Sequence, residues 1–134
     1  MDYEVLDGPE DVPVTDLAEY DSVAADNHIR QLDAALALEH LRLKLWYFEP
    51  GEGVAYHAHL HQEEVFSVLA GSFELELGDP GDTEVRTVDE GAWWVAKPQV
   101  GHGHRYLGDD RGVVLAIGAP AVDDEPVDPT ELVG

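Results

Sequence analysis

Three histidines and two carboxylates fall within eight consecutive positions, HAHLHQEE, at residues 57–64. Imidazole nitrogens and carboxylate oxygens are ligands that bind iron, manganese, nickel, copper and zinc in proteins. Because the chain contains no cysteine, any metal site in it must use nitrogen and oxygen ligands. The segment is therefore a candidate metal site, and the elements around it decide which of its five polar side chains could bind an ion.

His57 and His59 are two residues apart in a segment, 54–59, whose pattern predicts a β-strand. Side chains two apart in a strand point to the same face, so this pair could bind one metal ion side by side. Glu64 begins the next predicted strand after a tight turn and could return beside them. A further histidine from a distant strand would complete four protein ligands, and two more histidines fall within residues 102–104.

The elements that must position these residues are short strands. Apolar and polar side chains alternate with a period of two in several segments, separated by turn residues about every 8 to 12 positions. No helical pattern alternates with the strands, which argues against a parallel α/β sheet. The predicted fold class is all-β, a sandwich or barrel, with strands at 41–48, 54–59, 64–70, 73–77, 84–88, 92–96, 104–107 and 113–117.

The two ends of the chain differ from this strand-rich middle part. Residues 1–27 are acidic and rich in turn formers, with one helical turn predicted near residues 16–20, and apolar spacing predicts a short helix or loop over 29–41. The end of the chain is acidic and contains prolines, so we expect it to be disordered or extended along the surface. The predicted organisation is an acidic N-terminal arm with a short helical segment (1–40), a β-barrel (41–118) and an acidic C-terminal tail (119–134).

The chain carries 29 acidic and 7 basic residues, a formal net charge of -22. Such a charge repels nucleic acid and anionic lipid, so neither is an expected partner. The acids are spread over the arm, the turns and the tail, and Lys44 and Lys97 are the only lysines. This pattern is typical of proteins from salt-loving organisms, where salt screens the self-repulsion of the surface. An acidic interaction surface is the alternative interpretation.

The sequence shows no targeting signal. Its first residues, MDYEVLDGPEDVPVTD, lack the basic and apolar regions of a secretory signal peptide. No apolar run approaches the roughly 20 residues that a membrane-spanning helix needs. We therefore expect a cytoplasmic protein.

Glycines frame the histidine-rich segment in a recognisable way. Residues 51–71, GEGVAYHAHLHQEEVFSVLAG, resemble the first motif of the cupin family, G-x5-H-x-H-x3,4-E-x6-G, without a gap. The second cupin motif, roughly G-x5-P-x-G-x2-H-x3-N, is matched loosely by residues 91–104, GAWWVAKPQVGHGH. This second match has one extra residue before the proline, one before the glycine, and Gly108 in place of the asparagine. The resemblance covers about residues 41–118.

The cupin resemblance implies a double-stranded β-helix, or jelly-roll barrel, with a metal ion at its mouth. Carried over to this sequence, the ligands are His57, His59, Glu64 and His104, holding one divalent transition metal ion (iron, manganese, nickel, copper or zinc). His102 precedes His104 by two residues, so a slip of the loop could offer either. His104 is favoured because it keeps the G-x2-H spacing and begins the predicted strand.

The neighbouring residues have simpler interpretations. His61 lies in the turn before Glu64 and is expected on the surface or at the rim of a pocket. Glu63 points away from Glu64, toward solvent or a group that supports the site. Trp93 and Trp94 cannot share a strand face, so one is expected in the core and the other on a sheet surface or a dimer contact.

The resemblance implies a small-molecule metalloenzyme, dioxygenase-like or isomerase-like, although the fold does not choose among these reactions. A non-catalytic barrel that senses or binds a ligand or a metal is the alternative. No nucleophile triad, phosphate loop or paired glycosidase carboxylates are present in the sequence. The basic residues that could bind a carboxylate or phosphate of the ligand are Arg42, Lys44, Lys97 and Arg105.

The predicted strand at 64–70 is apolar on both faces, with Val65 and Leu69 on one and Phe66 and Val68 on the other. A strand that is apolar on both faces indicates a second buried surface. A homodimer formed by sheet packing or strand exchange is the simplest expectation.

Overall fold

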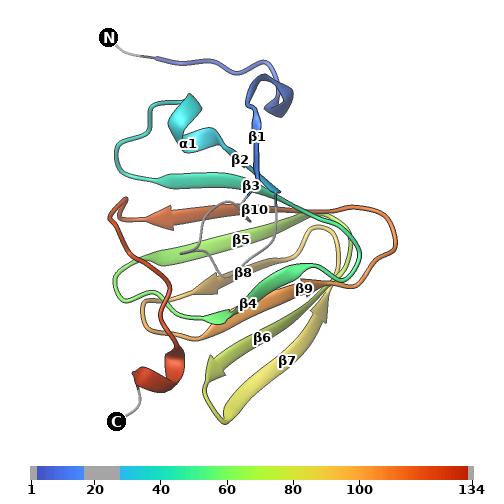
Figure 1. The fold of residues 1–134 in the computed structure, drawn as a ribbon, viewed down its shortest axis with the longest axis vertical. Coiled ribbons are helices and arrows are strands. Elements are labelled where there is room, and N and C mark those ends of the chain that lie inside the picture. The colour runs from blue at the N-terminus through green and yellow to red at the C-terminus, as the bar shows by residue number, and fades with distance from the viewer. Residues whose placement is uncertain (1–2, 17–27, 133–134) are drawn as a thin grey trace.

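Two antiparallel sheets pack against each other in the computed structural model of the chain, which describes residues 3–16 and 28–132 (Figure 1). The six-stranded sheet has the order β1 (Val14–Asp16), β2 (His28–Gln31), β3 (Arg42–Phe48), β10 (Gly112–Ala119), β5 (Glu63–Ala70) and β8 (Trp93–Ala96). The four-stranded sheet has the order β4 (Gly53–His57), β9 (His102–Tyr106), β6 (Phe73–Asp79) and β7 (Asp82–Val88).

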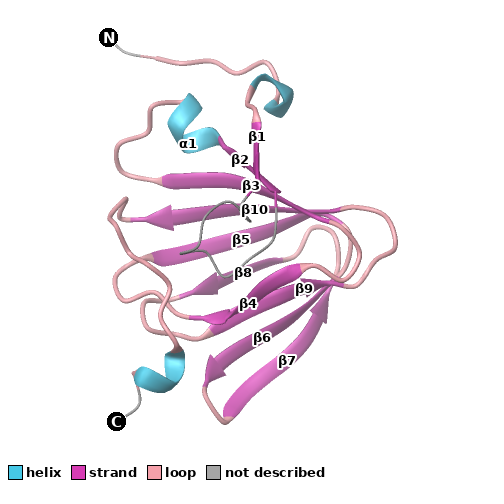
Figure 2. Cartoon of the chain, viewed as in Figure 1, coloured by secondary structure: helices cyan, strands magenta, loops and turns pink. Residues whose placement is uncertain are grey.

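Strands dominate the described part of the chain, and helices are short (Figure 2). They are the 3-10 turns Pro9–Asp11 and Pro129–Glu131 and the single turn α1 (Leu32–Ala35). This arrangement confirms the predicted all-β jelly-roll barrel. Among the described residues no helix is long and apolar enough to cross a membrane.

The core lies between the two sheets, where alternate side chains of each strand point inward. Aromatic rings fill much of it; Phe48 and Phe73 are fully buried and meet edge to face, with ring centroids 5.3 Å apart. The buried cluster consists of Phe48, Phe66, Val68, Phe73, Leu75, Trp94, Ala96, Tyr106, Val114 and Ala116. Residues of this cluster, including Phe66, lie next to the polar residues at one end of the barrel.

Two glycines of the motif are required by the backbone. Gly71, between β5 and β6, has a φ of 93°, and Gly91, before β8, has a φ of 94°. Residues with a side chain rarely adopt these left-handed conformations. The glycine frame recognised in the sequence therefore marks real turns between strands.

The N-terminal arm differs from its prediction. Instead of a helix over 29–41, residues 28–31 form strand β2, and α1 follows as a single turn. Ile29 lies opposite Trp46 in the β2–β3 ladder and is 2% exposed. Pairing with β3, which would otherwise be a sheet edge, satisfies more backbone groups and buries more apolar surface than a short helix would. The helical turn predicted near residues 16–20 lies outside the described residues, except for Asp16 at the end of β1.

One outer face of the six-stranded sheet is apolar and open. Trp93, Val95 and Leu69 are 64%, 45% and 44% exposed, while Trp94 on the inner face is 8% exposed. The expected division of the two tryptophans between the faces is confirmed. This apolar face is a surface against which a second copy could pack, and the homodimer stays a prediction.

Candidate metal centre

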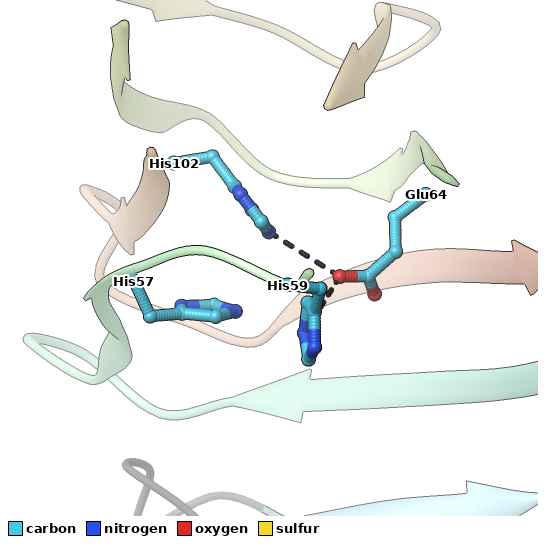
Figure 3. Close-up of side chains that lie close together, drawn as sticks. All are labelled: His57, His59, Glu64 and His102. Carbon is cyan, nitrogen blue, oxygen red and sulfur yellow. Dashed lines mark ion pairs between the residues drawn. The ribbon is translucent and has the colours of Figure 1, made fainter. Parts of the chain in front are cut away.

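Four side chains from both sheets converge at one end of the barrel (Figure 3). His57 ends β4, His59 follows it, Glu64 lies in β5 and His102 begins β9. One ligand atom from each, a ring nitrogen or a carboxylate oxygen, lies within 4.8 Å of all the others. Three imidazoles and one carboxylate at such distances can enclose a single ion.

Strand pairing explains why residues so distant in sequence meet. His57 and His102 are directly opposite in the β4–β9 ladder, and their ring centroids are 4.3 Å apart. His59 lies two residues beyond the end of β4, outside the strand that the sequence predicted to reach it, and its ring centroid is 5.0 Å from that of His57. Glu64 enters from the other sheet, so the cluster bridges the two sheets at the open end of the barrel.

Backbone carbonyls orient all three imidazoles. The ring Nδ1 atoms lie at hydrogen-bond distance from the carbonyl oxygens of Ala55 for His57 (2.7 Å), Asp124 for His59 (2.7 Å) and Val100 for His102 (3.0 Å). In a neutral ring, an Nδ1–H that donates to a carbonyl leaves Nε2 unprotonated and free to bind a metal. The three rings are therefore preset in the tautomer that a metal site needs.

The carboxylate of Glu64 faces two of these nitrogens. Its Oε1 lies 3.0 Å from Nε2 of His59 and 3.3 Å from Nε2 of His102. Although these atoms are close, Glu64 Oε1 and His102 Nε2 are buried and make no well-aligned hydrogen bond with any described residue. Buried polar atoms without a hydrogen-bond partner lower the stability of the fold unless another group binds them. A divalent transition metal ion satisfies both atoms at once, so the donor set fits the metal that the cupin resemblance implies.

Burial and neighbouring charges tune the protonation of the cluster. Burial, together with the nearby His102, lowers the pKa of His57 to about 4. Burial alone would raise the pKa of Glu64, but the contacts with His102 and His59 outweigh it and hold that pKa well below its usual range. At neutral pH the cluster thus offers a charged carboxylate and a neutral His57, both in the form that binds a metal.

We expect the metal-free protein to lose stability as the pH falls from 7 to about 5.5. Burial lowers the pKa of His104 to about 3 in the folded chain, whereas an unfolded chain has a histidine pKa near 6.5. The unfolded state therefore binds more protons in this window, and the free energy of unfolding falls by about 1 kcal/mol per pH unit for each such histidine. His57 acts in the same direction, while His59, whose pKa is raised through Glu64 despite its burial, acts in the opposite one.

Urea unfolding at pH 7 and 5.5, at constant salt, measures this effect. A His104→Phe protein carries the same surface charge, so the comparison isolates the buried imidazole, and its stability should depend less steeply on pH. An equally steep dependence in both proteins would contradict the assignment of a neutral, buried His104.

The sequence favoured His104 as the fourth ligand, and the structure instead places His102 beside the other three. Both side chains point into the barrel, but inward-facing residues on one strand are about 7 Å apart, so only one can be level with His57. His104 lies one step deeper, opposite Val54, where a bulge shifts the β4–β9 register. The G-x2-H spacing could not reveal this bulge. We therefore take His102 as the candidate fourth ligand.

His104 has a different environment. Four aromatic rings surround it, with centroids 5.3 to 6.1 Å from its own: those of Trp94, Phe48, Phe66 and Phe73. Neither of its ring nitrogens has a hydrogen-bond partner among the described residues. His104 lines the cavity, whereas His102 belongs to the cluster, is 1% exposed and is not among the residues that line the cavity.

The two bystanders of the histidine-rich segment lie as expected. His61 is exposed, and its backbone N–H donates to the carboxylate of Asp124. Glu63 is exposed on the face opposite Glu64 and pairs with Lys97. The eight-residue segment therefore supplies three side chains to the cluster, His57, His59 and Glu64.

The C-terminal tail contributes to the site in a way that the sequence did not reveal. Besides its carbonyl bond to His59, Asp124 accepts backbone N–H bonds through its carboxylate from Leu60 (3.3 Å), His61 (2.8 Å) and Gln62 (2.7 Å). Ala58 pairs with Val127 in an isolated bridge. Figure 1 shows this segment running past the loop between β4 and β5. The tail is extended, which is one of the two expected forms, and it also contacts the loop between β4 and β5 that carries His59.

A cavity of about 810 Å³ opens beside the cluster. His57, His59 and Glu64 line one part of it, Arg42 and Lys44 another, and the tail residues 122–126 a third. A volume of this size is typical of sites for small organic molecules.

Comparison with known families decides the assignment of the fold. Residues 44–118, more than half of the chain, match the family described as the Cupin domain. This chain is a member of the cupin family. A search of curated proteins found no match to this cupin.

Solved structures share the fold of this cupin over most of its length. An RmlC-like cupin from Shewanella frigidimarina is 18% identical, covers 92% of this chain and 97% of its own, and has a TM-score of 0.69. A sugar phosphate isomerase of the cupin superfamily from Silicibacter pomeroyi is 18% identical, with 85% and 74% covered and a TM-score of 0.68. KdgF from a Halomonas species is 24% identical, with 72% and 81% covered and a TM-score of 0.61. At these identities the similarity establishes the fold alone.

Proposed function

We propose that this cupin is a metalloenzyme that binds one divalent transition metal ion through His57, His59, Glu64 and His102 and acts on a small molecule in the adjacent cavity. One observation carries the proposal. Three imidazoles fixed by backbone carbonyls and one ionised carboxylate present ligand atoms within 4.8 Å of one another, and His57, His59 and Glu64 of this cluster line a cavity. A purely structural cluster would not leave buried Glu64 and His102 atoms unpaired.

A bound metal ion would supply Lewis-acid or redox chemistry at this position. The chain itself holds the ligand atoms in place, because each imidazole is tied to the backbone through Nδ1. The aromatic side chains Phe66 and Trp46 line the cavity, where they would reduce the access of water to a bound substrate.

We propose an isomerase-like or dioxygenase-like reaction. One structural neighbour, the protein from Silicibacter pomeroyi, is named a sugar phosphate isomerase, which makes sugar-derived acids and phosphates sensible first substrates to test. Because that protein is only 18% identical, the reaction must be established on this chain.

Elemental analysis of protein purified in high salt without added metal is the first test. We expect about one transition metal ion per chain, and substrate-dependent O2 uptake or isomer formation in a panel of sugar-derived, keto-acid and phenolic compounds. His57→Ala and Glu64→Ala proteins should lose the ion, because each removes one ligand atom from the cluster. His61→Ala is the matched control from the same segment and should retain it.

The outcomes separate the possibilities. Stoichiometric metal in the His57→Ala and Glu64→Ala proteins would contradict the assigned site. Wild-type protein that holds zinc at one equivalent but turns over no compound would favour a module that binds or senses a ligand.

A further inference from the structure

Strand β3 presents two basic side chains to the inside of the barrel. Arg42 and Lys44 line the cavity, followed by Trp46 on the same face, while Leu45 on the opposite face is buried away from it. The chain has only 7 basic residues against 29 acidic ones. Two of these few cations therefore share a cavity with the candidate metal cluster.

The other basic side chains are occupied elsewhere. Arg30 donates to Tyr47 and to two backbone carbonyls, and Arg111 lies over the Tyr47 ring at 4.0 Å. The remaining three pair with acids on the strands: Arg86 with Glu84, Lys97 with Glu63 and Arg105 with Glu74. Of the four basic residues that the sequence offered for an anion, only Arg42 and Lys44 line the cavity.

Strand register places Arg42 at a defined position relative to the metal cluster. Gly118 of β10 lies opposite Arg42 on one side and opposite Glu64 on the other, so the three residues form one row across the sheet. Neighbouring strands are about 4.8 Å apart, which puts the backbone of Arg42 about 10 Å from that of Glu64. A molecule of a few carbon atoms could span the space between the two side chains.

Gly118, between Arg42 and Glu64 in this row, has no side chain to fill the space above the sheet. Gly118 has no positive φ, and a Cβ there would make only ordinary contacts, at 3.6 Å, with Gln62 and Glu64. Neither the backbone nor the packing requires a glycine. What the missing side chain leaves is room over the sheet between Arg42 and Glu64.

We propose that Arg42, assisted by Lys44, binds a carboxylate or phosphate group of the substrate, while an oxygen-bearing group at its other end meets the metal site. The proposal rests on the proposed function and adds the class of substrate: a small, oxygen-rich molecule with one anionic end. A guanidinium binds such groups through paired N–H donors, and the ammonium adds a point charge.

The contacts of the two cations leave them able to bind. Lys44 is 2.8 Å from the buried carboxylate of Asp33, which uses one of its three N–H donors. Arg42 is 3.8 Å from Asp123, whose side chain is fully exposed on the tail. A pair this long and this exposed contributes little, so an incoming anion can replace Asp123 on the guanidinium.

Several acidic side chains surround the cavity, but their repulsion of an anion is weak because their charges are hydrogen-bonded, offset or screened. The carboxylate of Asp124 is held by backbone N–H groups, and that of Glu64 is among the ligand atoms whose charge a bound metal ion offsets. Glu125 is exposed to solvent, which screens it. The net positive charge in this part of the cavity therefore lies at Arg42, where an anion would bind.

Calorimetric titration of the metal-loaded, full-length protein tests this subsite with three matched probes: glycerol 3-phosphate, glycerate and glycerol. They share a diol and differ in carrying a phosphate, a carboxylate or no charge. At one fixed ionic strength, at least one anionic probe should bind the wild-type protein about 10-fold more tightly than glycerol, because it adds charge-assisted hydrogen bonds. Whichever anion binds more tightly identifies the group that the substrate carries.

Three variants test whether the anion binds at Arg42. Arg42→Gln should remove the preference for the anionic probe, and Asp123→Asn should strengthen anion binding by freeing the guanidinium. Arg105→Gln removes a similar arginine outside the cavity and should change nothing.

The result that overturns the subsite is wild-type protein that binds glycerol as tightly as both anions, or an Arg42→Gln protein that keeps the preference. Metal content measured on the same samples keeps the two proposals distinct. Full metal content without an anion preference overturns the subsite alone, whereas wild-type protein that takes up no metal overturns the proposed function.

Discussion

Replacing His102 by alanine should lower the affinity for the bound transition metal by more than about 100-fold, whereas replacing His104 by phenylalanine should leave the metal content unchanged. Loss of a group that merely supports a ligand costs about 10- to 100-fold in metal affinity, and loss of a ligand should cost more. His102 Nε2 lies 3.3 Å from Glu64 Oε1 within the cluster. His104 lies among aromatic rings, where a phenyl ring fits the same surroundings.

Competition with a chelator of known affinity measures both proteins against the wild type. His102 is almost fully buried, so alanine could also weaken the fold. A His102→Gln protein, which keeps more of the volume and a polar end, provides a second test, with circular dichroism to confirm folding. If the folded His102 variants keep wild-type affinity while His104→Phe loses the metal, the assignment of the fourth ligand is reversed.

The second large effect is expected at a residue that binds no metal. Replacing Asp124 by alanine should weaken metal binding by about 10-fold, because its carboxylate fixes the backbone of the segment between His59 and Glu64. The N–H bonds of this loop outweigh the effect of burial and hold the pKa of Asp124 below its usual range, so the carboxylate is charged at neutral pH. Without it, the carbonyl that orients His59 is also less firmly placed.

Asp123→Ala is the matched control for this prediction. Its side chain is adjacent, fully exposed and engaged only with Arg42 among the described residues, so metal affinity should stay at the wild-type level. Chelator competition and thermal unfolding of the metal-free proteins compare the two variants. Equal metal affinities for Asp124→Ala and the wild type would show that the tail lies over the site without supporting it.

The barrel was predictable because the sequence of each strand, taken alone, shows the pattern of a strand. A period of two and turn-forming glycines mark every strand from β3 to β10 within a few residues, and Gly71 and Gly91 take up the positive φ that their positions in the motif imply. The arm was not predictable in the same way. The apolar spacing around Ile29 fits a helix locally, and only the presence of an unpaired β3 edge makes the strand more favourable.

Three of the four clustered side chains were predictable for the same local reason. His57, His59 and Glu64 follow from strand parity and one short turn, and all three reach the cluster. The fourth depends on the register between β4 and β9, where a bulge places His102 opposite His57. Sequence spacing within one strand carries no information on such a shift between strands.

The role of the tail was hidden for a related reason. Asp124 is one acid among many in a proline-bearing segment, and its partners lie more than sixty residues earlier in the chain. The cavity face of Arg42 and Lys44 was also ambiguous, since either set of alternating side chains in β3 could have faced inward. Both features became visible only once the sheets were assembled.

Anomalous diffraction from crystals of the wild-type protein, at the absorption edge of the metal that elemental analysis identifies, tests the central claim most directly. We predict one strong peak at about 2.0 to 2.2 Å from Nε2 of His57, His59 and His102 and from a carboxylate oxygen of Glu64. No peak among these four side chains, or a peak bound by His104 in place of His102, would contradict the metal site described for this cupin.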